Sequence, residues 1–246
     1  LRADELFEAA KQLQVPVDHK ICMFVFCHYI TDLLQNTDQL FTVPRIHLTA
    51  KGHRARSQRT SQFFCFLFQD GTGFFHKIIL SSPMIRPLTG NVPWPLTVAI
   101  AQAECLVGRA EKYVIGQKPY DGSETFEISA AVSEARFTRY NEIRKRCKDI
   151  QTSAASYGWL LASIKMSWYL RYYGWKKLTA PVIIFQAEKD AFVSVRTMQK
   201  FAKKIQRRGK TSCEYVYIPE SKHEIFGSDD RTVKTYIERI LNFMAK

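Results

Sequence analysis

The sequence APVIIFQAEKD, residues 180–190, predicts the architecture of this 246-residue chain. Its β-branched and aromatic residues, bounded by Pro181, are typical of a buried strand. An amphipathic helix follows in RTMQKFAKKIQRR, residues 196–208. A second strand, SCEYVYIP at 212–219, leads into a second helix, SDDRTVKTYIERILNFMAK at 228–246. Strand, helix, strand and helix at these spacings predict an α/β fold with a mostly parallel sheet and helices on both faces.

The two helices of this unit carry packing and capping signals. Side chains expected to face the core recur every three or four residues. They are Met198, Phe201, Ala202 and Ile205 in the first helix, and Val233, Ile237, Ile240 and Met244 in the second. The second helix is expected to begin after Ser228 or Asp229, since both residue types are good N-caps.

The remaining elements are less regular. Before Pro83, apolar runs of strand length and periodic apolar spacing predict three strands and two helices. These are helices at 3–12 and 28–41 and strands at 21–26, 63–68 and 74–80. After Pro83 the chain is aromatic and rich in helix signals up to about Trp175. The helices expected there lie within 92–108, 135–149 and 157–175.

Charge and cysteine usage limit the function classes. The formal net charge of +13 favours polyanions, either nucleic acid or an anionic membrane surface. The basic stretch 45–59 has no interleaved aromatic side chains to stack on bases, so no nucleic-acid partner is expected. The six scattered cysteines form no C-x-x-C pair, which predicts reduced thiols and neither a zinc site nor a disulfide framework. Lys165 and Arg171 interrupt the longest apolar stretch, which argues against a membrane-spanning helix.

Two polar residues follow the predicted strands of the C-terminal unit. Asp190 comes just past the strand that begins at Val182, and His223 comes just past the strand that includes Tyr215. The loops at the carboxyl ends of parallel strands are where functional groups gather, and neighbouring strands lie about 4.8 Å apart. A carboxylate beside an imidazole fixes its tautomer and stabilises its protonated form, as a general base in acyl transfer requires.

The segments IILSSPMIRP, VIIFQAEKDAFVSV and IPESKHEIFGSDD resemble the α/β-hydrolase superfamily, in the branch of monoacylglycerol lipases and bacterial inner-membrane lysophospholipases. YITDLLQNTDQLF is similar to the helix that precedes the nucleophile strand of that family. The resemblance covers residues 28–41 and about 75–246. The family orders its triad as nucleophile, acid and histidine. By resemblance, Asp190 is the triad acid and His223 is the general base.

The resemblance also implies a domain organisation and a function. Residues 1–87 would hold the N-terminal part of the hydrolase core, 88–176 an inserted helical cap, and 177–246 the C-terminal part. The expected reaction is hydrolysis of a carboxylic ester in a lysophospholipid or monoacylglycerol, without metal or cofactor. The expected location is the cytoplasm, with peripheral contact to an anionic inner membrane. The alternative function is that of a non-catalytic protein that binds acyl ligands or anionic membranes.

The nucleophile of such an enzyme is missing from the sequence. The family presents a serine in G-x-S-x-G, where the glycines permit a strained strand-to-helix turn. No G-x-S-x-G occurs in the chain, and Ser57, Ser61, Ser81 and Ser82 all lack flanking glycines. This absence predicts an impaired catalyst.

Asp70 is the one alternative nucleophile, because FLFQDGTG resembles the elbow of α/β-hydrolases that use an aspartate. A parallel strand pair needs a crossover of a dozen or more residues. Only residues 71–75 separate Asp70 from the next strand of IIL character, so the segment is more typical of a hairpin around Asp70 and Gly71.

Residues 42–74 keep the length that the family uses there and lose its apolar pattern. Ordinary divergence preserves the hydrophobic pattern before residue identity. The hypothesis is therefore a change of reading frame over 42–74 that is corrected afterwards, in a chain whose N-terminal part is truncated and whose hydrolase fold is incomplete. A G-x-S-x-G in another frame of the coding DNA over this interval would support the hypothesis, and its absence would count against it.

Overall fold

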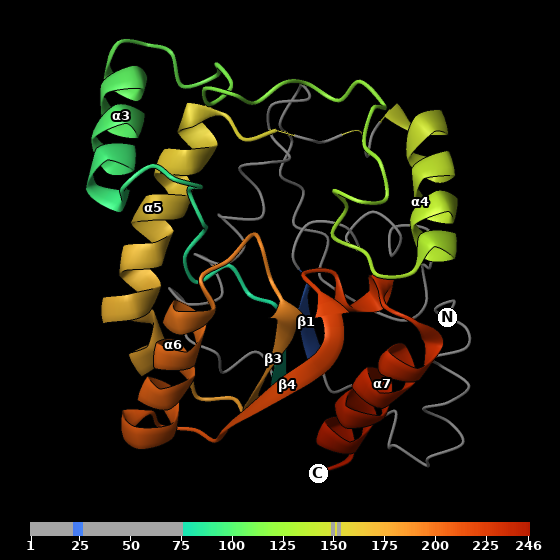
Figure 1. Cartoon of the computed structure of the whole chain (residues 1–246). Helices are drawn as coiled ribbons and strands as arrows, with labels where there is room; N and C mark the ends of the chain where they lie inside the picture. The colour runs from blue at the N-terminus through green and yellow to red at the C-terminus, as the bar shows by residue number, and fades with distance from the viewer. Residues whose placement is uncertain (1–21, 27–75, 149–150, 152–153) are drawn as a thin grey trace.

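The computed structural model describes residues 22–26, 76–148, 151 and 154–246 (Figure 1). Within them, four strands form one parallel sheet in the order β1-β2-β3-β4. The strands are β1 (Cys22–Phe26), β2 (Lys77–Ser81), β3 (Val182–Lys189) and β4 (Cys213–Lys222). The prediction of a parallel α/β sheet is confirmed.

The central strands are buried on both faces because each alternates its apolar side chains between two cores. In β2, Ile78 and Leu80 join one core and Ile79 joins the other. In β3, Ile184 and its neighbours at 182–185 divide in the same way. Continuous apolar runs of this kind are typical of parallel strands that are covered on both sides.

One face of the sheet is covered by α5 (Tyr157–Tyr172), the short 3-10 helix η4 (Gly174–Lys177) and α6 (Val195–Arg208) (Figure 1). All four α6 side chains predicted to face the core are buried there. Ser194 caps α6 by accepting a hydrogen bond from the backbone N–H of Thr197.

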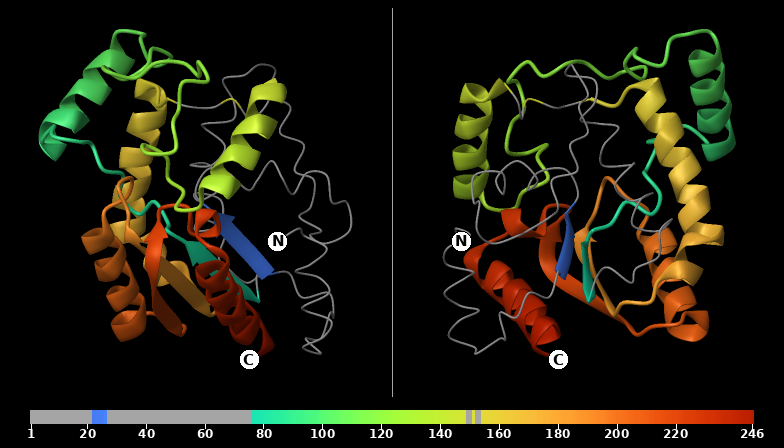
Figure 2. Two further views of the ribbon diagram at one scale, coloured as in Figure 1. Left: turned by 45° about the vertical axis from the view of Figure 1, so that its right-hand side comes forward. Right: turned by 180° about the vertical axis from the view of Figure 1, so that it is seen from behind.

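The other face is covered by α7 (Asp230–Ala245), as Figure 2 shows from two further sides. Of its predicted inward residues, Val233, Ile237 and Ile240 are buried, and Met244 is half-buried near the end of the helix. Asp229 is the N-cap: its carboxylate accepts from the backbone N–H of Thr232 at 2.8 Å. Helices on both faces of the sheet are thus confirmed.

The segment 88–176 leaves β2 and returns to β3. It contains α3 (Trp94–Leu106), α4 (Glu134–Arg146) and α5, and α3 and α4 lie beyond the carboxyl ends of the strands (Figures 1 and 2). Helix α3 packs on α5 through Ala101, Leu160 and Ile164. The carboxyl-terminal half of α5 instead belongs to the core that lies between the sheet and α6.

Several sequence-based predictions fall outside the described residues. They are the helices at 3–12 and 28–41, the strand at 63–68, the basic stretch 45–59, the atypical stretch 42–74, and the residues Ser57, Ser61 and Asp70. These predictions remain untested.

Substitution of Leu80 in β2 tests how much the core between the sheet and α5, η4 and α6 contributes to stability. Leu80→Ala should lower the free energy of unfolding by about 2–5 kcal/mol, because Leu80 is fully buried between β3 and the helices. Leu106→Ala makes the same change at a side chain that is 86% exposed and should cost within about 0.5 kcal/mol. Urea denaturation of both variants measures the difference, and equal losses would contradict this packing.

Candidate active site

Asp190 follows directly after β3, which ends at Lys189. Its Oδ1 accepts hydrogen bonds from the backbone N–H groups of Phe192 and Val193, at 2.9 and 3.0 Å. These bonds fold the loop back around the carboxylate. The Asp190 side chain is fully buried as a result.

His223 follows directly after β4, at a sharp bend. Glu220 has φ +53°, a left-handed conformation that is uncommon for a residue with a side chain. Two contacts from β3 hold the bend: the Glu188 carboxylate accepts from the Glu220 N–H at 2.6 Å, and the Ser221 hydroxyl accepts from the Glu188 N–H at 3.2 Å. Ser221 also donates to the Ile218 carbonyl at 2.7 Å. The bend therefore turns His223 toward the end of β3.

The two predicted residues lie in contact. His223 Nδ1 is 2.8 and 2.9 Å from the two oxygens of Asp190. The His223 side chain is 5% exposed, and the Phe192 ring packs against it with a centroid separation of 5.0 Å. Since the carboxylate accepts the Nδ1 proton, Nε2 of the neutral ring carries the lone pair. This arrangement can take up a proton at Nε2 while the buried carboxylate stabilises the resulting charge.

Glu188 and Ser221 contribute to this geometry and were not predicted from the sequence. Their contacts join residues more than thirty positions apart, which no local pattern reveals. The sequence shows only a serine two residues before a histidine, and its burial becomes evident in the structure alone.

Ser81 is the last residue of β2, and Ser82 follows it at the same edge of the sheet. Ser82 has φ +41° and is fully buried, and its backbone N–H donates to the Phe185 carbonyl at 2.9 Å. Its Oγ has no hydrogen-bond partner among the described residues. The bend at Ser82 lacks the glycines that open a nucleophile elbow to substrate, and its hydroxyl is sealed from solvent.

Glu224, the residue after His223, is the most strongly perturbed acid beside the pair. Burial raises the pKa of its carboxyl to about 7. The charge of His223 lowers that pKa, Glu124 raises it, and Arg144 lowers it. The perturbation of Glu224 was also not predicted from the sequence. Two of the charges that act on it, Glu124 and Arg144, are distant from it along the chain.

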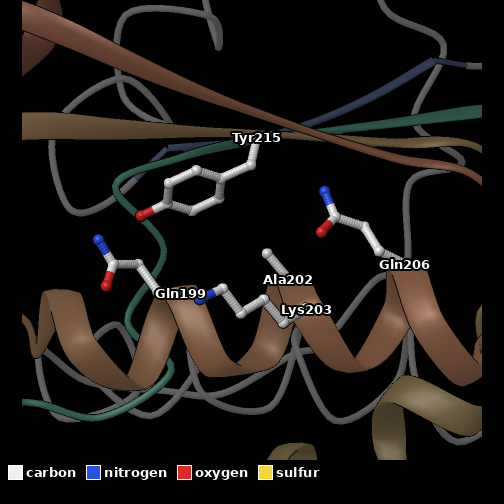
Figure 3. Close-up of a pocket in the computed structure, with 5 residues that line it drawn as sticks. All are labelled: Gln199, Ala202, Lys203, Gln206 and Tyr215. Atoms are coloured by element: carbon white, nitrogen blue, oxygen red, sulfur yellow. The ribbon is translucent and has the colours of Figure 1, made fainter.

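A cavity of about 240 Å³ opens elsewhere, between α6 and β4 (Figure 3). It is lined by Gln199, Ala202, Lys203, Gln206 and Tyr215. Several of its polar groups are already engaged: the Tyr215 hydroxyl donates to Gln186, and the Gln206 amide donates to the Cys213 carbonyl at 3.0 Å. None of its lining residues belongs to the loops of Asp190 or His223.

Two further properties concern the described residues alone. No three His, Cys, Asp or Glu side chains among them gather as a bound metal ion would require. No helix in the described part of the chain is long and apolar enough to cross a bilayer.

The pattern of the Hydrolase_4 family, described as serine aminopeptidase, S33, matches residues 64–230. No curated protein matches the sequence.

Two similar solved structures are lipases. The monoacylglycerol lipase of Paleococcus ferrophilus has a TM-score of 0.53 at 12% identity, over 75% of this chain and 64% of that one. A soluble variant of monoglyceride lipase from Saccharomyces cerevisiae, in complex with a substrate analogue, has a TM-score of 0.53 at 13% identity, over 75% and 57%. The chain thus spans less than two thirds of either structure, and at these identities the likeness concerns the fold.

Proposed function

Because the chain belongs to the Hydrolase_4 family of serine aminopeptidases, S33, with the α/β-hydrolase fold, we propose that its site is that of a lipid-ester hydrolase. The family match confirms the superfamily predicted from the sequence. The likeness to monoacylglycerol lipases agrees with the predicted branch. The substrate class proposed is a monoacylglycerol or lysophospholipid.

One observation carries this proposal: the contact between His223 and the fully buried Asp190 at the carboxyl edge of the sheet. In the proposed reaction His223 is the general base, and Asp190 holds its tautomer and stabilises its charged form. Segment 88–176 is proposed to be the cap over this edge. Exposed apolar side chains in this segment suit contact with acyl chains; Leu96, Leu106, Val107, Ile115 and Ile128 are examples.

The proposal includes a catalytic defect in this chain. A relay of acid and histidine needs a hydroxyl to deprotonate, and no G-x-S-x-G supplies one. The match to the family pattern begins at residue 64, so residues 42–63 of the atypical stretch lie outside it. The chain is therefore proposed to keep the substrate site and to lack efficient turnover.

Titration with a monoalkylglycerol ether, a non-hydrolysable analogue of a monoacylglycerol, tests the site without requiring turnover. The imidazole signals of His223, assigned with His223→Gln, are expected to shift on addition of the ether. Glycerol alone should leave them unchanged. Unchanged His223 signals at saturating ether would contradict the proposed substrate site.

A second candidate function, binding to anionic membranes, is favoured by the charge distribution. Segments 154–187 and 191–213, which contain α5 and α6, hold eleven lysines and arginines and no aspartate or glutamate. Lys204 joins the two helices, because its Nζ donates to the Arg171 carbonyl at 2.6 Å. Burial lowers the pKa of Lys204, and the neighbouring cations, beginning with Arg171, lower it further.

Exposed aromatic side chains lie among the basic residues of segments 154–187 and 191–213, which together are called the basic face here. Trp168, Tyr172 and Tyr173 are exposed on α5 and at its end. Lys204 lies over the Tyr172 ring and Lys176 over the Tyr173 ring, at 5.7 and 5.9 Å. Trp and Tyr are suited to the headgroup level of a membrane, and lysines to its anionic lipids.

Sedimentation with vesicles tests this second function. The triple variant Lys200→Gln, Lys203→Gln, Arg207→Gln should lower partitioning onto phosphatidylglycerol vesicles by on the order of a hundredfold, at about 1 kcal/mol for each basic residue. The matched control removes three charges from α7, on the opposite face, by Arg231→Gln, Lys234→Gln and Arg239→Gln. Equal losses from both triples would contradict a specific face. Tighter binding to DNA than to the vesicles would contradict the lipid partner.

A further inference from the structure

Glu224 lies where the loop after β4 meets segment 88–176. Its backbone N–H donates to the Ala130 carbonyl at 3.3 Å, and the Gly227 carbonyl accepts from Val132 and Ser133 at 2.9 and 2.8 Å. A Cβ on Gly227 would lie 2.9 Å from that of Ala131, so the two chains are in close contact. In Figures 1 and 2 the short 3-10 helix η5 (Ile225–Gly227) accordingly lies beneath α4.

Lys222, on the other side of His223, joins the same segment. Its Nζ donates to the Ser129 carbonyl at 3.1 Å and lies 5.6 Å from the centre of the Phe126 ring. Both neighbours of His223 in the sequence are therefore held by residues 126–133. The position of the imidazole and the position of this segment depend on each other.

The charges that face Glu224 come from three elements. His223 belongs to its own loop, Glu124 to the irregular stretch before α4, and Arg144 to α4. Arg144 and Glu124 form an ion pair whose arginine side chain is only 2% exposed, and the Arg144 guanidinium lies 4.4 Å from the centre of the Tyr120 ring. A buried cation has lost its hydration water, so removal of its ion-pair partner would destabilise the fold.

The Glu224 side chain is half-buried, and one of its two carboxyl oxygens is enclosed. Its Oε1 is buried and has no hydrogen-bond partner among the described residues. A carboxylate in such a place is disfavoured relative to a carboxylic acid, because it has lost its water. This agrees with the pKa of about 7, a value close to the ordinary range of histidine.

We propose that Glu224 is a positioning residue of this site: its carboxyl, on the loop that segment 88–176 holds next to His223, couples the protonation of the imidazole to the contact with that segment. An ionised Glu224 favours the imidazolium, and a protonated imidazole favours ionised Glu224. Two groups that interact and titrate in the same range lose their protons in two steps, and each step belongs to the pair and not to one residue. Contact with segment 88–176 adds the influence of Arg144 and Glu124 to this equilibrium.

This inference rests on the proposed role of His223, and its test requires neither substrate nor nucleophile. Histidine signals followed by NMR from pH 5 to pH 9 are expected to give a broadened, two-step titration for His223. Glu224→Gln should make this a single step and lower its midpoint by roughly 0.5–1 pH unit, because a nearby opposite charge is removed. Glu224→Asp keeps the charge and should retain two steps.

Glu220→Gln is the matched control. Glu220 is an exposed glutamate at the end of the same strand, and its change should leave the His223 curve unshifted. An unchanged His223 curve in Glu224→Gln, or an equal shift in Glu220→Gln, would overturn the proposal. The response to the alkylglycerol ether is measured separately, so failure of the proposed function is recognised independently.

The pH dependence of the free energy of unfolding gives a second readout. The folded pKa of Glu224 lies above its ordinary value of 4.5, so the folded protein binds the proton more tightly than the unfolded chain. The carboxyl therefore stabilises the fold below about pH 4.5, and this contribution is lost as pH rises to about 7. Glu224→Gln should remove that fall relative to Glu220→Gln. A uniform loss of stability at every pH would indicate a role in packing alone and overturn the proposal.

Discussion

Incubated with a monoacylglycerol or a lysophospholipid, this chain is expected to release fatty acid no faster than its own His223→Gln variant. The proposed loss of the nucleophile would remove covalent catalysis, and loss of such a group typically costs on the order of a millionfold in turnover. The contact between Asp190 and His223 does not compensate, since those side chains act only on a hydroxyl presented to them. Fatty-acid release measured by mass spectrometry gives the two rates.

His223→Gln is the control in that experiment because it replaces the proposed general base, at a buried position, with another polar side chain. A rate for the unmodified chain a thousandfold or more above that of His223→Gln would contradict the proposed defect. It would mean that a side chain of this polypeptide serves as nucleophile without the glycine-flanked motif.

Asp190→Ala is expected to destabilise the fold strongly. The carboxylate accepts from two backbone N–H groups, of Phe192 and Val193, and from His223, in a place with no access to solvent. Three donors lose their acceptor at about 1–3 kcal/mol each, so the free energy of unfolding should fall by at least about 3 kcal/mol. Thermal or urea denaturation measures the change.

Two further variants show whether the loss of stability in Asp190→Ala comes from the missing hydrogen-bond acceptor. Asp190→Asn keeps an acceptor oxygen for the two backbone groups and should lose less stability than Asp190→Ala. Asp230→Ala removes a carboxylate that is 95% exposed and should have little effect. Equal stability of Asp190→Ala and Asp230→Ala would show that the loop after β3 does not depend on its carboxylate.

The C-terminal unit could be predicted because its signals are local. A bounded run of β-branched residues gave β3, and helical spacing gave the buried face of α6. Asp190 and His223 followed from their places after two parallel strands, since neighbouring strands bring such loops together. Their contact of 2.8 Å agrees with that reasoning, and their catalytic roles remain proposals.

What surrounds the pair could not be predicted, because it depends on contacts between distant segments. Glu188 reaches the N–H of Glu220 only once the strands have paired, and Arg144 approaches Glu224 only when α4 packs beside η5. The length of β4 was also underestimated. It extends to Lys222, three polar residues past the predicted end at 219, because β3 supplies a partner there.

Labelling of the intact chain with a fluorophosphonate ester, followed by intact-mass and peptide mass spectrometry, tests the central claim most directly. The reagent bonds covalently to a serine only where a base activates the hydroxyl in an accessible site. The expected result is an unmodified chain, with Ser82 and every other serine unlabelled. Stoichiometric modification of one serine, abolished by His223→Gln, would contradict the account of a hydrolase site that has lost its nucleophile.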